Sequence, residues 1–284
     1  MINNGDTPPT WSATSTHGTS LRIGLVQMRC EKGEIATNLT RIHAYLREAH
    51  ARQVDILCFP EMSITGYINP VHQPAAVLRL DSPEVAQFVA MTAEFPLTAI
   101  AGIVEANGQE KPFITQIVAS AGKFLGYYRK KTIPDDEAGW FSAGETITIF
   151  THPAITFGVA VCADIGSPEI FAESAKRGAR LVFAAAAPGL YGPQSRRDWG
   201  AGFAWWRNEC MTKLHQYARA NRITIAVATQ AGRTVDEDFP GGGYVFAPDG
   251  TCVAATPDWS EGVLYVTIPQ GDWDGTDHEF SSRE

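Results

Sequence analysis

The chain has 284 residues, of which 44% are hydrophobic and 19% charged, and its formal net charge is -8. This composition is typical of a globular protein that buries a sizeable core. The acidic balance disfavours nucleic acid as a partner, because phosphate binding requires clustered Lys and Arg. No stretch reaches the roughly 18 consecutive apolar residues of a transmembrane helix. The sequence therefore predicts neither a nucleic-acid nor a membrane partner.

The five cysteines are odd in number, widely spaced and without a C-x-x-C pair. Neither a disulfide framework nor a zinc site is expected, and a reducing cytoplasm is the simplest location. The first 20 residues are rich in Thr, Ser, Asn, Gly and Pro, and they lack the basic start and apolar centre of a secretory signal. We predict a flexible N-terminal tail over 1–20, one domain over 21–270 and a short C-terminal tail over 271–284.

Apolar periodicity predicts strands that alternate with helices along most of the chain. A strand at 22–28 precedes a helix at 38–52, whose apolar residues recur at helical spacing. The runs 55–59 and 154–161 are continuously apolar, which is typical of strands buried on both faces. The other expected strands are 98–105, 113–119, 124–128, 181–187, 223–229, 243–247, 251–255 and 263–268, and the other expected helices are 83–92, 168–177 and 205–221. This order predicts an α/β fold with more than one parallel run.

Three of the expected strands end next to a residue with catalytic chemistry. Glu61, Lys130 and Cys162 each follow such a strand, and reactive groups of parallel sheets gather where strands end. Each residue also has a structural interpretation: a buried small hydrophobe for Cys162, a solvated acid for Glu61, and part of an exposed basic run for Lys130. The catalytic hypothesis requires these three side chains to meet.

The chemistry of the three side chains is complementary. Cys162 lies just before an expected helix start at 167–169, where main-chain N–H groups can lower a thiol pKa and hold an oxyanion. A partly desolvated Glu61 is suited to act as a general base. A lysine beside a thiolate favours the charged sulfur and stabilises a tetrahedral oxyanion. No metal or other cofactor is needed for this chemistry, because the thiolate is the nucleophile.

Four segments together resemble the motifs of the nitrilase-like carbon–nitrogen hydrolases. Phe59–Tyr67 (FPEMSITGY) resembles the family's glutamate motif, and Tyr128–Pro134 (YRKKTIP) resembles its lysine motif. Gly158–Asp164 (GVAVCAD) is similar to the cysteine motif, and Glu137–Gly144 (EAGWFSAG) carries a second glutamate that many members have. The resemblance covers roughly residues 21–270. It implies a four-layer α-β-β-α sandwich of two face-to-face sheets.

The resemblance also implies a catalytic set and a mechanism. Cys162 would attack the carbonyl carbon after Glu61 takes the thiol proton, while Lys130 and the backbone N–H of Ala163 would stabilise the oxyanion. Glu61 would return a proton to the leaving amine, and water would then hydrolyse the thioester. Glu137 is expected to help position that water. Members of the family associate through outer helices, which implies a homodimer or a larger homo-oligomer.

Two further residues are candidates for substrate contact, and several positions depart from the family pattern. Tyr67 is expected either to line the substrate site or to pack in the core, and Ile165 to lie beside the substrate. Thr132 stands where many members have His, and 165–167 lacks the Arg and the aromatic residue that members often carry. Small side chains at Gly166 and Ser167 suggest room for a bulkier substrate.

The sequence therefore predicts a cysteine hydrolase that acts on a small amide or N-carbamoyl compound. The dipeptide after Cys162 is Ala-Asp rather than the Trp-Glu of true nitrilases, which favours an amide over a nitrile. A nitrilase, an amide acyltransferase, a non-catalytic binding member and a redox protein remain alternatives. Substrate panels scored by ammonia release separate the first two from an amidase.

Overall fold

The computed structural model describes residues 20–269 and 281–282. Its α-helices are α1 (Ile35–Ala51), α2 (Pro83–Met91), α3 (Pro168–Lys176) and α4 (Trp199–Asn221), and its short 3-10 helices are η1 (Pro74–Ala76), η2 (Cys162–Gly166) and η3 (Gln194–Arg196). The strands are β1 (Ser20–Gln27), β2 (Ile56–Cys58), β3 (Thr98–Asn107), β4 (Glu110–Ser120), β5 (Lys123–Arg129), β6 (Ile149–His152), β7 (Ile155–Val161), β8 (Leu181–Ala186), β9 (Thr224–Thr229), β10 (Ala231–Arg233), β11 (Asp238–Pro240), β12 (Tyr244–Phe246), β13 (Cys252–Ala255), β14 (Gly262–Pro269) and β15 (Ser281–Ser282). The predicted tails, 1–20 and 271–284, lie outside the described residues except for Ser20 and β15.

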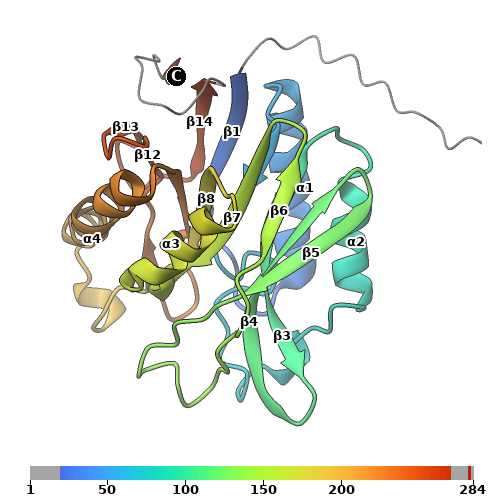
Figure 1. Cartoon of the computed structure of the whole chain (residues 1–284). Coiled ribbons are helices and arrows are strands. Elements are labelled where there is room, and N and C mark those ends of the chain that lie inside the picture. Colours follow the sequence, from blue (N-terminus) through green and yellow to red (C-terminus); the bar gives the residue numbers. More distant parts are fainter. Residues whose placement is uncertain (1–19, 270–280, 283–284) are drawn as a thin grey trace, which may run out of the picture.

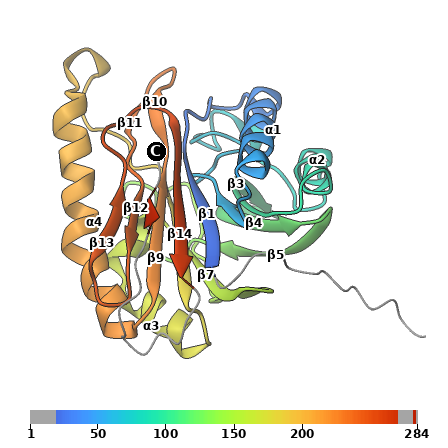
Figure 2. The same ribbon diagram turned by 90° about the horizontal axis from the view of Figure 1, so that it is seen from above.

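Two large sheets form the centre of the fold. One has the order β15-β14-β1-β2-β3-β4-β5 and the other has the order β13-β12-β9-β8-β7-β6. The two sheets face each other, with α1 and α2 outside the first and α3 and α4 outside the second (Figures 1 and 2). This confirms the predicted four-layer α-β-β-α sandwich.

The central strands of each sheet run parallel, and this orientation decides where the site forms. Strands β1, β2 and β3 are parallel neighbours, as are β7, β8 and β9. Strand β5 runs in the same direction as β3, because both pair antiparallel with β4. The carboxyl ends of β2, β5, β7 and β8 are therefore the places where loops can bring side chains together.

Burial divides the apolar side chains into two clusters. One fills the space between the sheets and extends to α3 and α4, with Phe157, Phe183 and Tyr244 among its largest members. The other fills the space between the first sheet and its helices, where α1 contributes Leu39, Ile42 and other buried residues at helical spacing. The continuous apolar runs are explained by this arrangement, because both faces of the central strands are covered.

Most predicted elements are present, and the differences have local causes. Helix α4 begins at Trp199, six residues before the predicted start, because the Asp198 side chain caps it by accepting a hydrogen bond from the Ala201 N–H at 2.9 Å. The first turn of α4 contains Gly200 and Gly202, and glycines in the sequence are more typical of a loop than of a helix. Strand β6 was not predicted, since its four residues acquire a strand conformation only by pairing with β7.

No helix among the described residues is long and apolar enough to cross a membrane.

Candidate active site

The three side chains singled out in the sequence meet at the carboxyl ends of the strands. Glu61 lies three residues after β2, Lys130 directly follows β5, and Cys162 directly follows β7. The Lys130 ammonium lies 3.0 Å from a Glu61 carboxylate oxygen and 2.7 Å from a Glu137 oxygen. The second glutamate of the motif set therefore joins the first through the lysine.

Lys130 lies between these carboxylates with no exposed surface. Burial alone would lower the pKa of Lys130, but the nearby Glu61, Cys162 and Glu137 together raise it above the usual value. The side chain therefore remains an ammonium at neutral pH. The exposed alternative for this basic run does not apply to Lys130, although its neighbour Arg129 is partly exposed.

Glu61 is held at both carboxylate oxygens. Its Oε1 accepts from Lys130, and its Oε2 accepts a hydrogen bond from the backbone N–H of Ala187, at 2.9 Å. Burial raises the pKa of Glu61 to about 7, with Glu137 also raising it and Lys130 and a hydrogen bond with Cys162 opposing the shift. A carboxyl group that titrates near neutrality can both accept and return a proton at physiological pH.

Cys162 sits at the turn from β7 into η2 with a φ of 41°, in the left-handed region that residues other than glycine rarely adopt. Burial and the nearby Glu61 charge raise the pKa of its thiol, while Lys130 opposes the shift. The thiol is thus neutral at rest and needs a base to become a thiolate. Unlike Glu61, Lys130 and Glu137, Cys162 keeps part of its surface exposed.

Tyr67 packs in the core and contacts the catalytic set, whereas its expected place beside a substrate stays a prediction. Its hydroxyl donates a hydrogen bond to the Glu137 carboxylate oxygen that does not contact Lys130. Its ring packs against Phe239, with 5.8 Å between the ring centroids. Burial and the Glu137 charge raise the pKa of Tyr67 well above its usual value, so the hydroxyl keeps its proton as a donor.

Asp164 has a positioning function that the sequence did not reveal. Its Oδ1 accepts from the backbone N–H groups of Lys131 and Thr132 at 3.2 and 2.8 Å. Its Oδ2 accepts from the Tyr128 hydroxyl at 2.8 Å and the Val161 N–H at 2.9 Å. One buried carboxylate thereby fixes the segment around Lys130 against the turn that carries Cys162. The only signal was a charged residue next to an apolar run, which requires buried partners.

The residues of the turn after Cys162 differ in how much of their surface is exposed. Ala163 is half-buried and Ile165 is 4% exposed, where it packs into the core between the sheets. Gly166 is exposed, and a Cβ atom added there would meet no atom within 4 Å. Open space therefore lies at Gly166, while Ile165 has little surface left for a substrate.

Thr132, which stands where many members of the resembled family have His, bonds to a side chain of the cysteine turn. Its hydroxyl lies 2.8 Å from the Ser167 hydroxyl, so the two small polar side chains bond across the gap between the lysine segment and the cysteine turn. The pair gives these two segments a second link besides Asp164.

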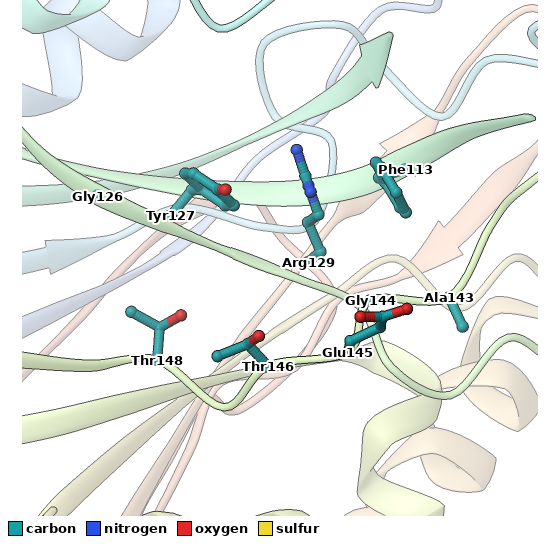
Figure 3. Close-up of a pocket in the computed structure, with 9 residues that line it drawn as sticks. All are labelled: Phe113, Gly126, Tyr127, Arg129, Ala143, Gly144, Glu145, Thr146 and Thr148. Atoms are coloured by element: carbon teal, nitrogen blue, oxygen red, sulfur yellow. The ribbon is translucent and has the colours of Figure 1, made fainter. Parts of the chain in front are cut away.

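A hollow of about 460 Å³ beside β5 is separate from the catalytic set (Figure 3). None of Glu61, Lys130, Glu137 and Cys162 lines it. Phe113, Tyr127 and Arg129 line one side of it, and Thr146 and Thr148 line the other. Arg129 also forms an ion pair with the buried Glu105. Because neighbouring residues of a strand point to opposite faces, Arg129 points away from the side on which Lys130 meets Glu61.

Within the part of the chain that the structure describes, no group of three or more His, Cys, Asp or Glu side chains is arranged to hold a metal ion.

Comparisons with known proteins agree with the motif set. The family model "Carbon-nitrogen hydrolase" matches residues 22–277. The N-carbamoylputrescine amidase of Arabidopsis thaliana is 26% identical over 264 residues, which cover 85% of this chain and 84% of that protein. The glutamine-dependent NAD(+) synthetase of Acinetobacter baylyi is 24% identical over 87% of this chain. The matching part spans only 44% of that synthetase, less than half of its length.

A solved structure has the same fold. A mutant of an amidase of the nitrilase superfamily, from Nesterenkonia AN1, superposes with a TM-score of 0.75 at 23% identity and covers 90% of this chain and 94% of that one. The family model spans nearly all of the described residues, including every strand that supports the site. The chain therefore belongs to the carbon–nitrogen hydrolase family.

Proposed function

We propose that the chain hydrolyses the C–N bond of a small amide or N-carbamoyl compound, with Cys162 as the nucleophile. The observation that carries the proposal is the contact of buried Lys130 with both Glu61 and Glu137, beside Cys162, which acts on the pKa of both Glu61 and Lys130. An ammonium, a base and a nucleophile are the groups that acyl transfer through a thiol requires.

In the first half of the reaction Glu61 takes the proton of the Cys162 thiol, and the sulfur bonds to the carbonyl carbon. The resulting oxyanion is stabilised by the Lys130 ammonium and the backbone N–H of Ala163. The C–N bond then breaks, and Glu61 gives its proton to the departing nitrogen. Ammonia or an amine leaves, and a thioester remains on Cys162.

In the second half water replaces the amine. Glu61 takes a proton from the water, whose oxygen bonds to the thioester carbon, and Glu137 orients that water through its place beside Lys130. The C–S bond breaks, the sulfur recovers the proton from Glu61, and an acid leaves. The pKa of Glu61 near 7 suits both directions of proton transfer.

The relatives suggest substrates for the first test. The purified chain is incubated with acetamide, N-carbamoylputrescine, glutamine and propionitrile, and released ammonia is measured. We expect release from an amide or carbamoyl compound, none from Cys162→Ala, and an acyl adduct on Cys162 by intact mass spectrometry. Cys252→Ala is the matched control, because Cys252 is also half-buried but far from Lys130 in sequence and fold.

Three outcomes would contradict the proposal. Release from propionitrile alone favours a nitrilase over an amidase. Equal release by the wild type and Cys162→Ala removes the cysteine mechanism, and no release from any of the four compounds favours a non-catalytic member or a different C–N substrate class.

A further inference from the structure

A largely buried lysine outside the catalytic set links two segments of the site. The Lys32 side chain is 9% exposed, and its ammonium lies 2.7 Å from a Glu237 oxygen and 2.7 Å from an Asp236 oxygen. It also lies over the Tyr67 ring, 5.8 Å from the centroid.

The first of these segments carries Tyr67. Gly66 has a φ of 71°, and a Cβ atom there would lie 2.4 Å from the backbone oxygen of Glu31 and 2.7 Å from the Cα of Lys32. The backbone before Tyr67 thus packs directly on the backbone of Lys32. Because Tyr67 donates to Glu137, which contacts Lys130, any shift of the Tyr67 ring reaches the catalytic set.

The second segment follows β8. A Cβ atom on Gly189 would lie 2.6 Å from Oε1 of Glu237, the carboxylate oxygen that does not bond Lys32. The next residue, Leu190, donates its N–H to the backbone oxygen of Asp238 at 2.9 Å. Two residues before Gly189, the Ala187 N–H donates a hydrogen bond to Glu61 at 2.9 Å, and the same N–H lowers the pKa of the Cys162 thiol. Glu237 therefore rests on the segment that supplies this N–H.

From these contacts we propose that Lys32 is a positioning residue, which holds Tyr67 and the Glu237 turn in place and thereby sets how well the site holds an amide. The inference rests on the proposed function, since it assigns Lys32 a part in the same reaction. Without the Lys32 ammonium, the Asp236 and Glu237 carboxylates repel each other, and the Glu237 carboxylate is no longer held against Gly189. The segments that carry Tyr67 and Gly189 then become free to separate.

The two carboxylates on Lys32 differ in exposure, which supplies a matched control. The Asp236 side chain is 66% exposed and the Glu237 side chain 26%. An exposed pair contributes little because water screens it, so Asp236→Asn should leave acetamide hydrolysis within about twofold of wild type. Lys32→Met should lower kcat/KM by about tenfold, mainly through KM, and Lys32→Arg should restore most of the loss.

A chemical probe separates positioning from a merely structural role. Alkylation of Cys162 by 2-chloroacetamide forms an S–C bond as chloride leaves, and this reagent carries the amide that the site should hold. Methyl methanethiolsulfonate modifies the same thiol without an amide. We expect Lys32→Met to slow the first reagent about tenfold and the second less than twofold. Gly189→Ala, which pushes on Glu237 from the other side, should act like Lys32→Met.

The alkylation rates test the role of Lys32 even if the chain hydrolyses none of the tested compounds. Equal slowing by both reagents, or equal effects of Lys32→Met and Asp236→Asn, would overturn it. A wild type that releases no ammonia, but whose alkylation by 2-chloroacetamide depends on Lys32, contradicts the proposed function and leaves the assignment of Lys32 standing.

Discussion

Lys130 is a single cation shared by two buried carboxylates, so its removal leaves both without a counter-charge. Among the described residues, Glu61 and Glu137 form an ion pair with no other lysine or arginine. Breaking a buried ion pair from one side costs about 3–5 kcal/mol, because the remaining charge stays buried. The lysine therefore contributes to stability as well as to the proposed oxyanion stabilisation.

We predict that Lys130→Met lowers amide turnover by at least about a thousandfold and destabilises the fold by about 3–5 kcal/mol. The loss of stability should grow with pH. A carboxyl with a raised folded pKa binds more protons folded than unfolded, so ionisation at higher pH favours the unfolded state. Urea unfolding at acidic and alkaline pH checks this sign.

The adjacent lysine is the control for that experiment. Lys131 donates to the backbone oxygen of Glu145 rather than to a buried carboxylate. Lys131→Met should change the free energy of unfolding by no more than about 0.5 kcal/mol. A similar loss in both variants would mean that Lys130 acts only as one charge of a basic run.

The pKa of Glu61 predicts a pH profile. The proposed base is active when ionised, and burial raises its pKa to about 7, so kcat/KM should rise with pH and reach half its maximum near pH 7. Alkylation of Cys162 by iodoacetamide should follow the same curve, because Glu61 also takes the thiol proton there. Stopped assays in overlapping buffers measure both curves.

Glu61→Gln distinguishes this base from the thiol itself. Without the carboxylate, alkylation depends on ionisation of Cys162, whose pKa burial raises well above its usual value. The alkylation curve should therefore move to more alkaline pH. An unchanged curve in Glu61→Gln would assign the titration near pH 7 to another group.

At the residue scale, the sequence supported some choices better than others. Arg129, Lys130 and Lys131 are alike in charge, and only the motif resemblance singled out Lys130. Strand alternation then separates Arg129, which pairs with Glu105, from Lys130. Asp164 could not be assigned from the sequence, because its four donors come from segments that meet only in the folded chain.

At the scale of elements, Asp164 joins the end of β5 to the turn after β7. Its carboxylate accepts four hydrogen bonds, and three of the donors are backbone N–H groups. Burial raises the pKa of Asp164, while the bonds from Val161 and Thr132 oppose that shift. An amide in this position would direct an N–H group toward donors instead of an acceptor.

We predict that Asp164→Asn destabilises the fold by about 2–3 kcal/mol, because at least one buried donor loses its acceptor. It should also lower turnover by about a hundredfold, since displacement of Cys162 from Lys130 disturbs the reacting geometry. Urea unfolding and ammonia release measure the two effects. Tyr128→Phe is the milder comparison, because it removes one donor and should cost about 1 kcal/mol.

Loss of activity without loss of stability in Asp164→Asn would instead indicate that Asp164 contacts the substrate directly. The prediction therefore separates a positioning role from a catalytic one.

The elements that sequence reasoning identified are those with strong periodicity or continuous apolar runs. Strands β7 and β8 and helix α1 carry such patterns, since their burial is nearly uniform or strictly periodic. Strands β10 and β11 have only three residues each and pair with each other. Tertiary contacts define them, including the bond from the Ala231 N–H to the Met28 oxygen at 3.0 Å.

At the scale of the whole molecule, apolar side chains remain exposed beside helix α4, which forms part of the outer layer (Figure 2). Trp205 is 40% exposed and contributes to a hollow of about 270 Å³ together with Leu190 and Tyr191. Trp259 is also exposed and packs edge-on against Phe203. Exposed apolar patches of this kind mark interaction surfaces.

The family resemblance implies association through outer helices, so we predict that a second copy of the chain covers this surface. Closed dimers bring the same patch of both copies together, and a charge placed there is repeated across the interface. Trp205→Glu should therefore shift the wild-type oligomer toward monomer by at least about tenfold in dissociation constant, because a buried unpaired charge is costly. Analytical ultracentrifugation over a range of concentrations measures the shift.

Trp140→Glu is the matched control, since Trp140 has nearly the same exposure, 39%, but lies in the segment between β5 and β6. Its association should equal that of the wild type. A wild type that is monomeric at all concentrations contradicts the predicted oligomer, whereas equal dissociation by both variants places the interface elsewhere than on α4. Amide turnover in the Trp205→Glu monomer then tests whether the site is complete within one copy, as expected when Glu61, Lys130, Glu137 and Cys162 all meet within a single chain.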